Sequence, residues 1–133
     1  MNFELLQSAV EQVARLSPKF HWVGVYLLRG DQLELGPFVG EPTEHQSIPV
    51  GVGVCGTAVK ENADQNVPDV RERGNYLACS LKTRSELVVL IRDPQRKVVG
   101  QIDIDSHELN AFGPEEERTV RRIADQLGEV WSG

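Results

Sequence analysis

Apolar residues recur at helical spacing at both ends of the chain. The first run, with Asn2 before it as a helix cap, consists of Phe3, Leu6, Val10, Val13 and Ala14. The second run follows Pro114 and three glutamates, and consists of Val120, Ile123, Ala124, Leu127 and Trp131. The spacing therefore predicts one amphipathic helix near each terminus.

Other apolar segments between these two helices predict strands. "HWVGVYLL" is apolar on both faces, which is typical of an interior strand, and "RGDQ" predicts a hairpin turn into "QLELG". "SELVVLIRD" and "VVGQIDIDS" predict two more strands joined by a turn at "DPQRK". A short helix is expected at 55–61, and the Gly-, Pro- and polar-rich stretch 37–53 is expected to be a long loop.

The order of these elements predicts an α+β fold. The 133 residues are the length of one domain, so we expect a single domain over 1–133. Its core would be an antiparallel β-sheet, with the N- and C-terminal helices packed on it.

Charge and hydropathy exclude several classes of protein. A net charge of -6 argues against a nucleic-acid surface, and no apolar run is long enough to span a membrane. The acidic N-terminus lacks the features of a signal peptide, so a cytoplasmic location is expected. Thiols stay reduced there, which favours reactive or simply buried roles for Cys55 and Cys79 over a structural disulfide.

Each cysteine allows two interpretations. Lys82 and Arg84 follow Cys79 closely, and positive charge favours a reactive thiolate. Cys55 lies at an expected helix N-terminus, where the helix dipole has the same effect. The alternative for both residues is a small side chain buried in the core.

Three carboxyl groups are candidates for one site. Asp103 and Asp105 are two apart in a strand and share a face, either as a solvated polar face or as part of a pocket. Glu86 begins a strand that is apolar on both faces, an unusual position for a charge. If the three gather, their repulsion raises a carboxyl pKa, and one group can stay protonated as an acid.

Two aromatic residues share a strand face in the same way. Trp22 and Tyr26 are four apart, and they are either core residues or the walls of a ligand pocket. No CxxC, HExxH or histidine pair is present, so the spacing predicts no metal site. No phosphate-binding loop is present either, and no cofactor is expected.

Several stretches together resemble a known family. "HWVGVYLL", "LELGPFVGEP", "IPVGVGVCGTAV", "VPDV", "YLACSLKTRSELVVL", "VVGQIDIDS" and "FGPEEE" resemble GAF domains, and among them the free methionine-(R)-sulfoxide reductases. This resemblance implies a GAF-like fold and a small enclosed pocket for a free amino acid. It also implies reduction of a sulfoxide by a thiol, with electrons from thioredoxin or another thiol reductant, and a homodimer formed through the terminal helices.

The resemblance also implies roles for individual residues. Cys79 matches the catalytic cysteine and Cys55 a second cysteine of the family. The matches to substrate-binding residues are Trp22, Tyr26, Glu86, Asp103 and Asp105. His45 occupies the position of the usual loop cysteine, which leaves Cys55 or an outside thiol to resolve an oxidised Cys79.

Two functions follow from these patterns. The first is reduction of free methionine-(R)-sulfoxide through a cysteine sulfenic acid, which requires a reactive Cys79. The second is a non-catalytic GAF module that senses a small ligand, which does not. Because the 133 residues hold no output domain for a sensor to regulate, the enzyme is favoured.

Overall fold

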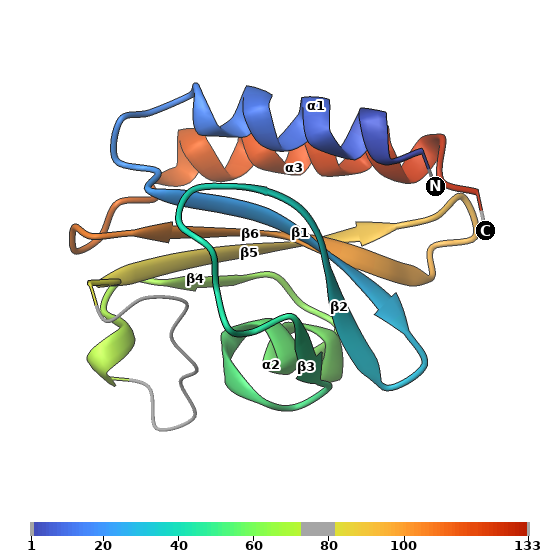
Figure 1. Ribbon diagram of the computed structural model, residues 1–133, viewed down its shortest axis with the longest axis horizontal. Coiled ribbons are helices and arrows are strands. Elements are labelled where there is room, and N and C mark those ends of the chain that lie inside the picture. Colours follow the sequence, from blue (N-terminus) through green and yellow to red (C-terminus); the bar gives the residue numbers. More distant parts are fainter. Residues whose placement is uncertain (1, 73–81, 133) are drawn as a thin grey trace.

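The computed structural model describes residues 2–72 and 82–132 (Figure 1). The helices are α1 (Phe3–Ala14), α2 (Gly53–Glu61), α3 (Pro114–Glu129) and the short 3-10 helix η1 (Val70–Glu72). The strands are β1 (Trp22–Arg29), β2 (Gln32–Val39), β3 (Ser47–Pro49), β4 (Gln65–Val67), β5 (Ser85–Arg92) and β6 (Val98–Ser106).

All six strands form one antiparallel sheet in the order β3-β2-β1-β6-β5-β4. Figure 1 shows α1 and α3 side by side on one face of this sheet, while α2 lies on the opposite side. The predicted α+β fold, with the two terminal helices packed on an antiparallel sheet, is confirmed.

The terminal helices begin where the sequence predicts. The Asn2 side chain accepts a hydrogen bond from the Glu4 amide at 2.7 Å, and Pro114 occupies the first turn of α3. None of the helices in residues 2–72 and 82–132 combines the length and the hydropathy needed to cross a bilayer.

The sheet has an apolar layer on each face, which explains why β1 and β5 are apolar on both. In β5, Leu87, Val89 and Ile91 pack toward α1 and α3. The alternate residues Val88 and Leu90 join a second cluster with α2. A strand buried on both faces has little polar alternation, so its sequence is almost continuously apolar.

The expected long loop over 37–53 is partly wrong. β2 continues to Val39, and β3 pairs with β2 through Ser47 and Pro49. The pairing with β3 extends along β2 only from Gln32 to Glu34. Pro37 therefore lies where β2 is an edge strand, a position that tolerates its missing N–H group.

Candidate functional site

Three buried carboxyl groups meet on the α2 side of the sheet. Glu86 of β5 pairs directly with Asp105 of β6, which in turn pairs with Trp22 of β1. Asp103 lies two residues before Asp105 and shares its face. We call Glu86, Asp103 and Asp105 the acid cluster, and their exposed fractions are 2%, 0% and 2%.

Burial and two acidic neighbours favour the protonated form of Glu86. Burial raises the pKa of Glu86 well above its usual value, and repulsion from Asp103 and Asp105 together with their hydrogen bonds adds to this effect. The Glu86 carboxyl is therefore favoured in its neutral form, and a neutral carboxyl can donate a proton.

Cys55 lies against this carboxyl. It is the third residue of α2, with 4% of its surface exposed, and its Sγ donates to Glu86 Oε2 at 3.8 Å. Gln101 Nε2 donates to the Cys55 carbonyl at 3.0 Å and so fixes the start of α2 to β6. Cys55 is thus a buried residue at a helix N-terminus and also a neighbour of the acid cluster.

Cys79, the predicted catalytic cysteine, lies within 73–81 and therefore outside the described residues. Its role, and its relation to Cys55, stay predictions.

Trp22 and Tyr26 lie beside each other and hold the loop after β2. Their ring centroids are 6.3 Å apart. Trp22 Nε1 donates to the Glu41 carbonyl at 3.0 Å, and the Tyr26 hydroxyl donates to the His45 carbonyl at 2.8 Å. These two bonds fix the path of the loop by its backbone.

The structure decides between the interpretations of some residues and not others. A solvated polar face for Asp103 and Asp105 is wrong, because the two residues are at most 2% exposed, and Cys55 of α2 lies close to Asp103. Trp22 and Tyr26 are packed in the same apolar cluster as Cys55. Their role as pocket walls stays a prediction.

Comparison with known proteins identifies the family. Residues 4–132 match the GAF domain. This chain belongs to the GAF domain family. It is 40% identical over 110 residues to the free methionine-R-sulfoxide reductase of Escherichia coli (strain K12), which covers 83% of this chain and 66% of that protein.

Two solved structures of reductases share this GAF fold. The type II free methionine-R-sulfoxide reductase from Thermoplasma acidophilum is 41% identical, with a TM-score of 0.90 over 94% of this chain and 88% of that one. The free methionine-R-sulfoxide reductase from Neisseria meningitidis, in complex with its substrate, is 31% identical. Its TM-score is 0.87 over 95% of this chain and 75% of that one. This chain spans about two thirds of the length of the curated relatives that it matches.

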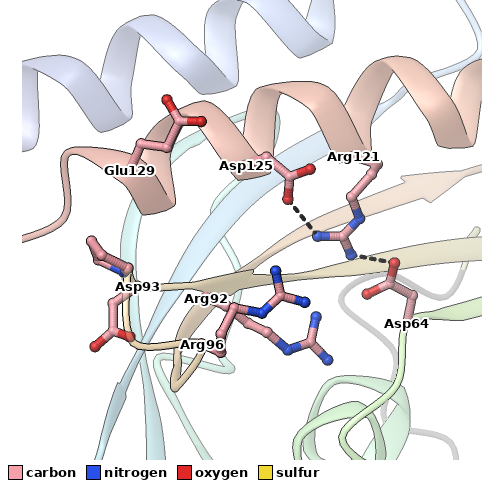
Figure 2. Close-up of a pocket in the computed structure, with 8 residues that line it drawn as sticks. Asp64, Arg92, Asp93, Arg96, Arg121, Asp125 and Glu129 are labelled. Atoms are coloured by element: carbon pink, nitrogen blue, oxygen red, sulfur yellow. Dashed lines mark hydrogen bonds and ion pairs between the residues drawn. The ribbon is translucent and has the colours of Figure 1, made fainter.

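This GAF domain also has a charged groove of about 550 Å³ at the far end of β5 (Figure 2). There Arg121 of α3 forms ion pairs with Asp64 and Asp125, and donates to the Leu90 carbonyl at 2.9 Å. The groove includes Arg92, six residues from Glu86 along β5, which is about 20 Å. The groove is therefore separate from the acid cluster. The ion pair of Arg121 with Asp64 and its bond to the Leu90 carbonyl join α3 to the sheet, whereas the pair with Asp125 lies within α3.

Two residues of the GAF site were missed in the sequence. Gln101 is fully buried on the same strand face as Asp103 and Asp105, and the spacing of two in "QIDID" is the signal that would have found it. Gly24 lies under the Trp22 indole, where a Cβ atom would come within 2.3 Å of the ring. A glycine inside an apolar strand is the sign of such a close approach.

Proposed function

We propose that this chain reduces free methionine-(R)-sulfoxide to methionine. The Cys79 thiolate attacks the sulfoxide sulfur, and the sulfoxide oxygen passes to Cys79 as a sulfenic acid while the thioether leaves. The sulfur of the substrate is reduced by two electrons, and Cys79 is oxidised by two. The relatives and solved structures named as free methionine-R-sulfoxide reductases support this activity.

The observation that carries the proposal is the burial of Glu86 beside Asp103 and Asp105, which raises the pKa of Glu86. A sulfoxide sulfur becomes more electrophilic when its oxygen is protonated. We assign this proton to Glu86 as a general acid, because its raised pKa favours the protonated form over that of an ordinary carboxyl. The negative charge of Asp103 and Asp105 attracts the ammonium group of the amino acid.

Regeneration of Cys79 is assigned to Cys55. The Cys55 thiol attacks the Cys79 sulfenic acid, which forms a disulfide and releases water. Thioredoxin or another dithiol then exchanges with the disulfide, and both thiols return. Burial of Cys55 next to Glu86 supports this order. Once Glu86 has given its proton to the sulfoxide oxygen, its carboxylate can take up the Cys55 proton at a distance of 3.8 Å and pass it to the departing hydroxyl, which leaves as water.

The aromatic pair and its loop are assigned to substrate binding. Trp22 and Tyr26 offer apolar ring surface to the side chain of the amino acid, and they hold the backbone of the loop at Glu41 and His45. We propose that this loop is the lid that keeps water from the reaction.

The proposal extends to assembly and location. Phe3, Leu5, Leu16 and Val130 are large apolar residues that are at least 43% exposed on or beside α1 and α3. A homodimer through these helices would bury them. The reaction needs Cys55 and Cys79 as thiols, which fits the reducing cytoplasm.

The test is turnover of each methionine sulfoxide epimer with dithiothreitol. Wild-type protein should consume the R epimer and leave the S epimer, and Cys79→Ser should lose the activity. Binding of the R epimer without turnover in the wild type would instead indicate a sensor module. Activity that survives in Cys79→Ser would remove the proposed nucleophile.

A further inference from the structure

Three side chains of the site offer atoms that can ligate a metal ion, although the proposed reaction uses no metal. Cys55 Sγ and one carboxylate oxygen each of Glu86 and Asp103 all lie within 4.8 Å of one another, and all three residues are buried. The three come from α2, β5 and β6, so the sheet and the helix it supports bring them together.

A buried polar side chain next to Cys55 is a second, independent observation. Gln101 is 0% exposed, and its Oε1 accepts no hydrogen bond from the described residues. Its Nε2 is held at the Cys55 carbonyl, so the amide lies next to Cys55 on the strand face of Asp103. A buried acceptor of this kind calls for an ion or a water molecule as its partner.

We propose that Cys55, Glu86 and Asp103 bind a divalent transition metal of the zinc class, with Gln101 Oε1 or water as a further ligand. Zn²⁺ binding would release the protons of Cys55 and Glu86, because the metal takes these ligands as thiolate and carboxylate. One thiolate and two carboxylates are ligands that Zn²⁺ accepts, and with one further ligand they suit a four-coordinate site. Zinc bonds of about 2.0–2.3 Å require these ligand atoms to approach one another by roughly 1 Å. Side-chain rotation in the three residues supplies that approach.

Metal binding also has a consequence for catalysis, which rests on the proposed function. A cation among Cys55, Glu86 and Asp103 takes Asp103 away from the substrate ammonium and Glu86 away from the sulfoxide oxygen. It also takes the Cys55 thiolate away from disulfide formation. Zinc is therefore expected to inhibit the reductase in competition with substrate. Spacing along the chain could not indicate this site, because residues 55, 86 and 103 come from three separate elements.

The direct test is a titration of the reduced full chain with Co²⁺ and Zn²⁺ under anaerobic conditions. Co²⁺ should bind one per chain and give a thiolate-to-cobalt charge-transfer band in the near ultraviolet, which Zn²⁺ should abolish. The band should vanish in Cys55→Ser and remain in Cys79→Ser. Absence of saturable binding, or a band that persists in Cys55→Ser, overturns the proposal.

Asp103 and Asp105 provide a matched pair, since both are buried acids on the same face of β6. Asp103→Asn should weaken Zn²⁺ binding by about tenfold or more, or about 1.4 kcal/mol, and Asp105→Asn by much less. Glu86→Gln should resemble Asp103→Asn. Equal losses in the two aspartate variants would overturn this ligand set, and near-ultraviolet circular dichroism shows whether each variant is folded.

Inhibition is measured separately, so that the two proposals can fail independently. If the wild type turns over no sulfoxide but shows the cobalt band, the proposed function fails and the metal site stands. If the wild type is active and binds Zn²⁺ without a rise in the KM for sulfoxide, the inhibitory role is overturned.

Discussion

Asp105 and Glu86 are direct partners across the β5–β6 ladder, and each is 2% exposed. Like charges in this position repel, and burial removes the water that would screen them. The pair is stable in the folded chain because Glu86 favours its neutral form.

Glu86→Gln should change how stability depends on pH. The pKa of Glu86 is raised in the folded chain, so from about pH 4.5 upward the folded state keeps a proton that the unfolded state loses. The free energy of unfolding should therefore fall as pH rises toward the folded pKa, by about 1.4 kcal/mol for each unit of elevation. Urea unfolding of wild type and Glu86→Gln in metal-free buffer at several pH values measures this fall, which should be shallower in the variant.

Glu44→Gln is the control for this series, because Glu44 is exposed. Its pH profile should match that of the wild type. A Glu86→Gln profile that also matches the wild type would contradict the raised pKa.

The helices and the long strands were predictable because their periodic patterns agree with their burial. Asn2, Pro114 and the apolar stripes mark the terminal helices, and "SELVVLIRD" is apolar because both faces of β5 are covered. β3 was missed because a strand of three residues is too short to carry a periodic signal. The burial of Asp103 was not decided by alternation, since Cys55 of α2, which lies close to it, is distant in the sequence.

Cys55→Ser should affect the two reductants differently. Dithiothreitol can reduce a sulfenic acid directly, whereas thioredoxin acts on a disulfide. The thioredoxin-driven rate should therefore fall by at least about tenfold more than the dithiothreitol-driven rate, which is about 1.4 kcal/mol. Steady-state assays with each reductant measure the ratio, and an equal fall in both would assign Cys55 a role other than resolution.

Tyr26→Phe should loosen the loop after β2. The variant loses the 2.8 Å bond to the His45 carbonyl, which should cost about 1–3 kcal/mol of unfolding free energy and raise the KM for sulfoxide. Urea unfolding and steady-state kinetics test this. His45→Ala is the matched control, because it keeps the main-chain carbonyl that accepts the bond. An equally large loss of stability in His45→Ala would show that the effect does not come from the Tyr26 hydrogen bond.

Arg121→Met should destabilise the fold and leave sulfoxide reduction intact. The variant removes the bond to the Leu90 carbonyl and the ion pairs with Asp64 and Asp125, at a cost of about 1–3 kcal/mol. Arg122→Met, at an exposed position one residue along α3, should change stability by less than about 0.5 kcal/mol. Thermal unfolding compares the two variants, and a loss of kcat in folded Arg121→Met would show that the groove acts on the site.

Leu5→Glu should shift the proposed homodimer toward the monomer. Leu5 is 46% exposed and lines a groove of about 200 Å³ between α1 and α3, and a buried charge at a subunit interface is costly. Light scattering after size exclusion measures the mass. Leu109 is similarly exposed, at 53%, but it lies after β6, so Leu109→Glu should leave the mass unchanged. A monomeric wild type would contradict the proposed homodimer.

The bonds from Trp22 and Tyr26 reach the main chain of the neighbouring loop and not its side chains. The side chains at positions 41 and 45 can therefore be substituted without a change in the backbone path of this loop. The resemblance to the free methionine-(R)-sulfoxide reductases implies a cysteine at the position of His45, and on this main-chain scaffold such an exchange would add or remove a redox-active side chain without altering the path of the loop.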